Sequence, residues 1–130
     1  MQKIIGVGGV FFKANNPQQL MEWYDEHLGI KFQHGFFEFK WADEPGNKAS
    51  GSTTFAIFKE DAADFKPSEK PYMINFRVAD LRALLKELRE KGVTVGDDKD
   101  IEEADYGRFG WLIDPEGNKI QLWEPEDNSA

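Results

Sequence analysis

The side chains that could do acid–base chemistry in this 130-residue chain are few and scattered. They are Glu38, Tyr106, Arg108 and Glu124. None stands at a spacing that requires catalysis, and the absence of cysteine excludes a Cys–His pair. No Ser–His–Asp set is recognisable either. The sequence therefore names no catalytic residue, and whether the protein is an enzyme stays open.

The two histidines are the usual candidates for metal binding, but neither is well placed for it. His27 falls in the last turn of a predicted helix, where a partly positive imidazole interacts well with the helix dipole. His34 falls in a turn and is expected to be exposed. Since neither has a second histidine at ligand spacing, we expect no metal site built on them.

The charge balance limits the class of partner. With 24 acidic and 16 basic residues the formal net charge is −8, which opposes binding to DNA or to an anionic membrane. We therefore expect a small-molecule ligand, no nucleic acid and no membrane. The length suits one domain over residues 1–130, without disulfides. The apolar start, residues 4–12, holds three glycines and is interpreted as a strand of a cytoplasmic protein rather than a signal peptide.

The first half of the chain alternates strand and helix signals. Residues 6–14 form a β-type run weakened by glycine, and the Asn-Pro pair at 16–17 predicts the start of an amphipathic helix that ends at Gly29. Residues 30–42 alternate aromatic and polar side chains, as a half-buried strand does. A polar loop follows, and residues 53–58 form the next predicted strand.

The second half repeats this pattern. At one offset, 74 − 10 = 64, the residues Val10, Phe12, Lys13, Asn16 and Leu20 correspond to Ile74, Phe76, Arg77, Asp80 and Leu84. Asp80 caps a second predicted helix that ends at Gly92. Strands are predicted at 93–96, 108–113 and 119–124, and the acidic stretch 97–105 is interpreted as a solvated loop. The repeat predicts an α+β fold of two βαβββ units, residues 1–65 and 66–130.

The closing hairpin, residues 106–124, turns at an Asp-Pro-Glu-Gly-Asn run and leads into Ile-Gln-Leu at 120–122. Together with the repeated unit, it resembles the vicinal oxygen chelate superfamily, which includes glyoxalases, bleomycin-resistance proteins and extradiol dioxygenases. The resemblance implies helices on one face of the sheet, a cleft on the other, and a homodimer. Gly107, Arg108, Asp114 and Pro115 belong to a run that supports this fold and says little about the reaction.

The resemblance also implies where a metal would bind, with two ligands in each unit. The matching positions hold Gly9, Ala56, Met73 and Gln121. Glycine, alanine and methionine supply no donor that suits zinc, iron or magnesium, and Gln121 alone cannot hold an ion. We therefore expect no metal and no cofactor, which argues against glyoxalase I and extradiol dioxygenase activity.

Strand alternation predicts which side chains share the face that such a metal would occupy. It selects positions on the first strand of each unit and on the last strand, and the resemblance adds two residues of an aromatic wall, Phe109 and Trp111. The predicted ligand-binding residues are Phe11, Lys13, Met73, Asn75, Arg77, Phe109, Trp111, Gln121 and Trp123. Lys13 or Arg77 would anchor an anionic group. The alternatives are core packing for the apolar residues, solvent exposure for the cations, and pinning of the backbone by Asn75.

Three functions from different classes remain open. The first is a metal-free binding protein of the bleomycin-resistance type, which sequesters an aromatic, carboxylate-bearing or cationic small molecule. The second is an isomerase or lyase of the superfamily with Glu38 or Glu124 as the base, although Glu124 should face away from Gln121. The third is a structural module whose cleft is closed by its own side chains.

Overall fold

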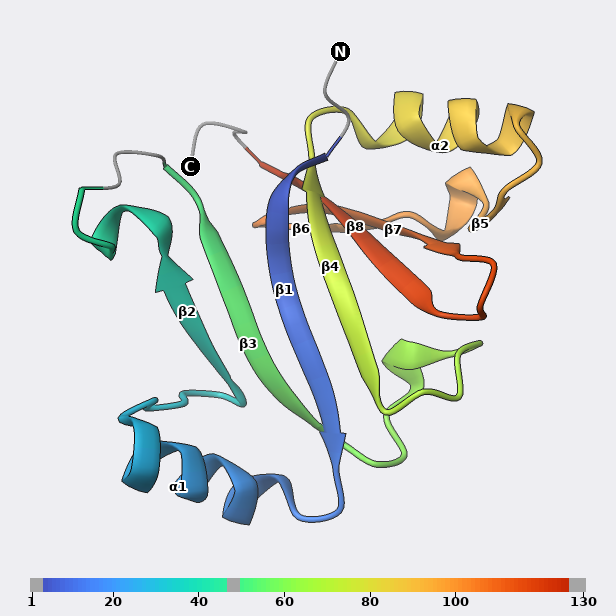
Figure 1. The fold of residues 1–130 in the computed structure, drawn as a ribbon. Helices are drawn as coiled ribbons and strands as arrows, with labels where there is room; N and C mark the ends of the chain where they lie inside the picture. The colour runs from blue at the N-terminus through green and yellow to red at the C-terminus, as the bar shows by residue number, and fades with distance from the viewer. Residues whose placement is uncertain (1–3, 47–49, 127–130) are drawn as a thin grey trace.

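The computed structural model describes residues 4–46 and 50–126. Figure 1 shows the helices beside a large, curved sheet. The elements in chain order are β1 (Ile4–Ala14), α1 (Pro17–Leu28), β2 (Phe36–Lys40), η1 (Trp41–Asp43), β3 (Ser52–Lys59), η2 (Ala63–Phe65), β4 (Tyr72–Val78), α2 (Leu81–Glu90), β5 (Thr94–Val95), η3 (Asp98–Asp100), β6 (Glu102–Ala104), β7 (Gly107–Ile113) and β8 (Lys119–Pro125). This confirms the predicted α+β class.

The two halves of the chain meet in the middle of the sheet. Across the described residues the strand order is β2-β3-β1-β4-β8-β7-β5, with β6 paired to β7. The first strands of the two halves, β1 and β4, are antiparallel neighbours, and each has the last strand of its own half, β3 or β8, as a parallel neighbour. The predicted repeat is thus visible as two half-sheets, β2-β3-β1 and β4-β8-β7-β5, joined along β1 and β4.

Both helices cover the same face of the sheet, at its two ends (Figure 1). Under α1, the Tyr24 ring packs edge-on against the Phe55 ring, with centroids 5.1 Å apart, and the Phe55 ring packs against the Phe12 ring, with centroids 5.6 Å apart. Under α2, the buried side chains of Val78, Leu81, Leu84, Leu85 and Leu122 form the main core. Along each strand, the residues that lie between those facing the helices point to the opposite side of the sheet, which we call the helix-free face.

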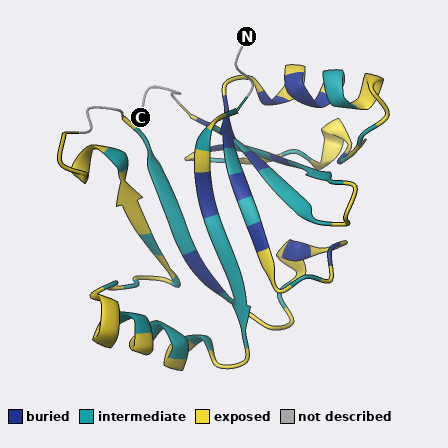
Figure 2. Ribbon diagram, viewed as in Figure 1, coloured by how far each residue is buried: buried dark blue, intermediate teal, exposed yellow. Residues whose placement is uncertain are grey.

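The second helix is the better buried of the two. Its N-terminus is capped by Asp80, whose side chain accepts a hydrogen bond from the Ala83 N–H at 3.1 Å, as the sequence predicted. Three leucines of α2 are buried, whereas α1 has no buried residue (Figure 2). The fold is therefore anchored mainly at the α2 end.

Two predicted segments differ in detail. The strand predicted over residues 30–42 is only five residues long, Phe36–Lys40, because His34 adopts φ 56° and the chain enters η1 at Trp41. An isolated β-bridge between Gln33 and Phe36 lies just before this strand. The acidic stretch 97–105, interpreted as a solvated loop, contains β6, because its backbone pairs with β7 while its acidic side chains stay exposed.

The Asp-Pro turn between β7 and β8 is held by one carboxylate. Asp114 accepts hydrogen bonds from the N–H groups of Glu116 and Asn118 and from the Asn118 side chain, at 2.9–3.0 Å. These bonds, those of Asn118 first, hold the pKa of Asp114 below its usual value. Asn118 also accepts from Lys70 at 3.3 Å, which ties the turn to the start of β4.

Candidate functional site

One row of side chains crosses the helix-free face in register. Through successive strand pairs, from β2 to β7, it contains Glu38, Thr54, Gly9, Asn75, Gln121 and Trp111. The row brings a carboxylate, a hydroxyl, two amides and an indole from five strands of both halves onto one surface. No single stretch of sequence contains this set.

All nine predicted ligand-binding residues lie on this face. The register places Phe11 opposite Met73, Arg77 opposite Trp123, and Trp123 opposite Phe109. The three residues of β4 are nearly inaccessible, with exposed fractions of 2% for Met73, 2% for Asn75 and 3% for Arg77, whereas the other six are partly exposed. The β4 residues therefore form the floor of the face and the others its walls. That any of them binds a ligand stays a prediction.

A bulge in β1 brings two glycines under the centre of the face. The register with β4 shifts between Val7 and Gly9. A Cβ on Gly8 would lie 2.2 Å from Asn75 Oδ1, and a Cβ on Gly9 would lie 2.6 Å from the Phe11 ring. Only glycine leaves room for these two side chains to lie flat over the strand.

A ladder of rings and one guanidinium runs along the end of the face nearest η1. Phe109 and Trp123 are stacked with centroids 5.9 Å apart and planes 3° apart. The Arg77 guanidinium lies 4.8 Å from the Trp123 ring and 5.2 Å from the Trp41 ring, a cation–π sandwich. Trp41 Nε1 donates to Thr53 Oγ1 at 2.8 Å, which fixes the second indole. Arg77, predicted as an anionic anchor, is thus held between two rings.

The opposite end of the face is covered by η2. Phe65, which is fully buried, packs against Phe58 at 5.2 Å, with the Lys13 ammonium 5.0 Å from its ring. Lys119 donates to the backbone oxygen of Asp64 at 2.6 Å, and burial lowers the pKa of this lysine. Lys13 and Lys119 therefore place two positive charges at this end.

Sequence reasoning missed Trp41 and Phe65. Trp41 was included in a predicted strand, and Phe65 lay outside every predicted strand and helix. Nothing in the sequence indicates their positions. In the structure Trp41 lies between Gly6 and Gly51, two glycines far apart in sequence, and a Cβ on either would lie 2.6 Å from its ring.

The residues at the metal positions of the superfamily do not fit a metal. Gly9 is covered by Phe11, and the oxygen of Gln121 accepts a hydrogen bond from Asn75 Nδ2 at 2.7 Å. Within residues 4–46 and 50–126, no three His, Cys, Asp or Glu side chains lie close enough together to hold an ion. His27 instead contacts the Trp23 backbone oxygen through Nδ1 at 3.0 Å, and His34 is exposed.

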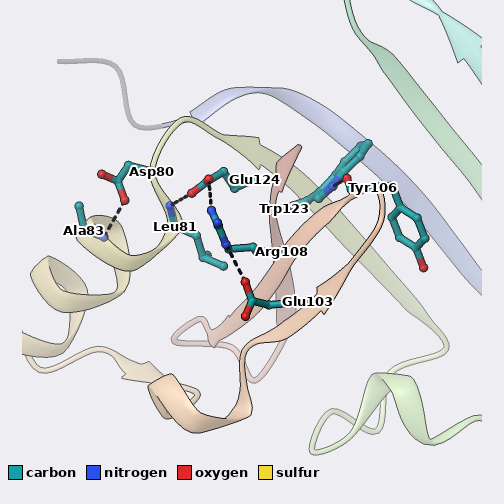
Figure 3. Close-up of polar contacts among 8 residues, drawn as sticks. All are labelled: Asp80, Leu81, Ala83, Glu103, Tyr106, Arg108, Trp123 and Glu124. Atoms are coloured by element: carbon teal, nitrogen blue, oxygen red, sulfur yellow. Dashed lines mark hydrogen bonds and ion pairs between the residues drawn. The ribbon is translucent and has the colours of Figure 1, made fainter. Parts of the chain in front are cut away.

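Glu124, one of the two candidate bases, belongs to the helix side of the sheet (Figure 3). Its Oε1 accepts from the Leu81 N–H at the start of α2 at 2.8 Å, and its Oε2 accepts from Arg108 at 2.6 Å. Arg108 also donates to Glu103 at 2.9 Å, and these two partners, Glu103 first, raise the pKa of Arg108. Glu124 thus joins β8 to α2 and faces away from Gln121, as predicted.

The family model of the glyoxalase-like domain matches residues 9–123, which include every residue of the row across the helix-free face. The chain belongs to this family. The glyoxalase-like domain places it in the vicinal oxygen chelate superfamily, so the predicted resemblance is confirmed.

Solved structures show the same fold. A variant of Streptomyces coelicolor methylmalonyl-CoA epimerase, in complex with 2-nitronate-propionyl-CoA, is 17% identical with a TM-score of 0.74, covering 98% of this chain and 99% of its own. The Mycobacterium tuberculosis epimerase is 23% identical with a TM-score of 0.61, covering 96% and 91%. An NAD-dependent benzaldehyde dehydrogenase from Legionella pneumophila is 14% identical with a TM-score of 0.59, covering 91% and 98%. At these identities the likeness is one of fold.

No curated protein matches the sequence of this glyoxalase-like chain. Among its described residues, no helix is both long and apolar enough to span a membrane.

Proposed function

We propose that this glyoxalase-like protein binds a small organic molecule on its helix-free face, without a metal ion, in the manner of a bleomycin-resistance protein. The observation that carries the proposal is the concentration of rings and cations there. Lys13, Arg77 and Lys119 lie among aromatic rings on this face, although the chain has a formal net charge of −8. Rings favour a planar body and cations favour a carboxylate, so the ligand is an aromatic or carboxylate-bearing molecule.

The structural neighbours support a small-molecule ligand of this general kind. The epimerases are bound to 2-nitronate-propionyl-CoA and to methylmalonyl-CoA, which are acyl-CoA esters. An apolar, ring-lined surface with few polar groups is also the usual composition of a small-molecule site.

Intrinsic fluorescence tests this proposal, because Trp41, Trp111 and Trp123 lie on the helix-free face and Trp23 lies on α1. We expect phenylacetate, an aromatic carboxylate, to change the emission saturably. Trp111→Phe and Trp123→Phe should reduce the change, and the control Trp23→Phe should not. The proposal is wrong if millimolar phenylacetate gives no saturable change, or if the change survives undiminished in the double variant at positions 111 and 123.

A second candidate function is an isomerase or lyase activity that uses Glu38 as the base. The specific observation is that Glu38 stands in the row with Asn75 and Gln121, exposed, and makes no hydrogen bond or ion pair within the described residues. Glu124, by contrast, is engaged at the start of α2. A carboxylate in this position can take an α-proton from a bound ester and return it.

Proton exchange tests this second function directly. Methylmalonyl-CoA is incubated with the protein in D₂O, and deuterium at the α-carbon is followed by mass spectrometry. An enzyme of this class incorporates deuterium, Glu38→Gln abolishes the incorporation, and the control Glu26→Gln, on exposed α1, retains it. Incorporation that persists in Glu38→Gln excludes Glu38, and incorporation no faster than in buffer argues against the activity on this ester.

We also propose that the protein is a cytoplasmic homodimer. On the helix-covered face, Val7 and Phe39 are 40% and 44% exposed between the two helices, an apolar area that a second copy would cover. Phe39→Glu should then convert dimer to monomer in light scattering coupled to size exclusion. A wild-type protein that is monomeric at micromolar concentration contradicts the dimer.

A further inference from the structure

Asn75 is an amide in a place where amides are rare. It is 2% exposed, on a central strand between Ile74 and Phe76. Its Nδ2 donates to Gln121 Oε1 at 2.7 Å, but its buried Oδ1 has no hydrogen-bond partner. Leaving such an oxygen unmet opposes folding by about 1–3 kcal/mol, so native proteins usually provide a partner.

The oxygen lies in a space that the backbone keeps open for it. It stands over Gly8, where any side chain would collide with it, at 2.2 Å from the position of a Cβ. The partner amide, Gln121, is partly exposed, and its Nε2 makes no hydrogen bond within the described residues. The pair therefore has one unmet acceptor, which is buried beneath the surface of the face, and one unmet donor, nearer the surface.

The pair keeps one unmet donor and one unmet acceptor whichever way the two amides are turned. If both carboxamides rotate by half a turn, Gln121 Nε2 donates to Asn75 Oδ1, and the unmet groups become Asn75 Nδ2 and Gln121 Oε1. One donor and one acceptor remain in either case. A ligand that satisfies both must present one acceptor and one donor.

The groups around the pair restrict this ligand further. Trp111 stands directly across from Gln121, with the Lys119 ammonium 5.6 Å from its ring. The Trp123 ring lies on the same strand as Gln121, two residues on, beside the Arg77 guanidinium at 4.8 Å. A flat apolar body fits against the indoles, and a negative charge on the ligand fits between the cations.

We propose that the Asn75–Gln121 pair selects aromatic α-hydroxy carboxylates, whose hydroxyl donates to one amide while the carboxylate accepts from the other. The inference rests on the proposed binding function and adds the substrate class to it. The α-hydroxyl distinguishes these ligands from simple aryl carboxylates, because only the former meet both unpaired groups. A site built to bond a hydroxyl discriminates strongly against an analogue that lacks it.

Two probes that differ by one hydroxyl test the inference. Mandelate, as each enantiomer, and phenylacetate share the ring and the carboxylate, and their affinities are measured by calorimetry. We expect one enantiomer of mandelate to bind about ten-fold more tightly than phenylacetate, as one additional hydrogen bond in a desolvated site allows. Asn75→Leu and Gln121→Met each remove one of the two amides. The variant that removes the partner of the hydroxyl should bring the ratio close to one, and the variant that removes the partner of the carboxylate should weaken the binding of both probes.

The variants separate loss of selectivity from loss of folding. Gln121 is partly exposed, so Gln121→Met should fold, and Asn75→Leu, of similar volume, is the second variant. Gln18→Met, on exposed α1, is the matched control and should keep the wild-type ratio. Equal affinities for mandelate and phenylacetate in the wild type would overturn the inference and leave the binding function intact. If neither probe binds, both the binding function and the inference fail.

Discussion

The contact of Glu124 with the start of α2 allows the sharpest stability prediction. Its side chain is 15% exposed, and its two oxygens meet the Leu81 N–H at 2.8 Å and Arg108 at 2.6 Å. A hydrogen bond to a charged group contributes about 1.5–3 kcal/mol, and a carboxylate at a helix N-terminus adds about 0.3–1 kcal/mol. Glu124→Ala removes both, so the free energy of unfolding should fall by about 2–4 kcal/mol.

The conservative variant separates the two contributions. Glu124→Gln keeps a neutral oxygen for the Leu81 N–H and loses the charge, so we expect a smaller loss of about 1 kcal/mol. Arg108→Met should also destabilise, because Glu124 then loses its charged neighbour on β7.

Urea unfolding followed by circular dichroism measures these differences, with Glu26→Ala on exposed α1 as the control. For a chain of this size, each kcal/mol corresponds to about 3 °C in Tm, so Glu124→Ala should melt about 6–12 °C lower. If Glu124→Ala unfolds within about 0.5 kcal/mol of the wild type, as an ordinary surface substitution does, the structural role given to Glu124 is wrong. A Glu124→Gln variant as unstable as Glu124→Ala would show that the Leu81 hydrogen bond is not retained by the amide.

Two further predictions concern the helix-free face and the last turn. Gly8→Ala forces the Asn75 side chain away, because the new Cβ would lie 2.2 Å from its oxygen. The free energy of unfolding, measured in urea, should fall by about 1–3 kcal/mol. An unchanged free energy of unfolding would contradict the close packing of Asn75 over Gly8. Asp114 has a lowered pKa in the folded protein, so its stabilising contribution is complete above the ordinary value of 3.8 and is lost as the pH falls through the lowered value. Asp114→Asn should therefore melt at a lower temperature at neutral pH, and its melting temperature should depend less on pH below that value. If the melting temperatures of the two proteins change in parallel from pH 2 to 7, this prediction is wrong.

Much of the fold could be predicted because its signals are local. The caps at Asn16 and Asp80, the stop at Gly29 and the Asp-Pro turn depend on neighbours a few residues away, and each is found where expected. The strand over residues 30–42 was overestimated for the same reason. Alternation of aromatic and polar residues cannot reveal that His34 and the turn into η1 confine pairing to Phe36–Lys40.

The helix-free face could be predicted only in part. Alternation along a strand places Phe11 and Lys13, or Asn75 and Arg77, on one side, but it carries no information on pairing between strands. The β1 bulge illustrates the limit, because uninterrupted alternation from Gly9 would put Val7 on the helix-free face, whereas Val7 pairs with Phe76 on the helix side. Trp41 and Phe65 reach the face from segments outside the sheet, and their positions depend on tertiary packing.

The glycine beneath Phe11 also constrains how the sequence can change over time. A histidine at position 9, the substitution that would begin to rebuild a metal ligand there, would start from a Cβ 2.6 Å from the Phe11 ring. The Phe11 ring must therefore turn away or become smaller before position 9 can accept a longer side chain. Each early step removes packing and gives no ligand set in return, so the route back to metal chemistry passes through variants that are less stable and not yet functional.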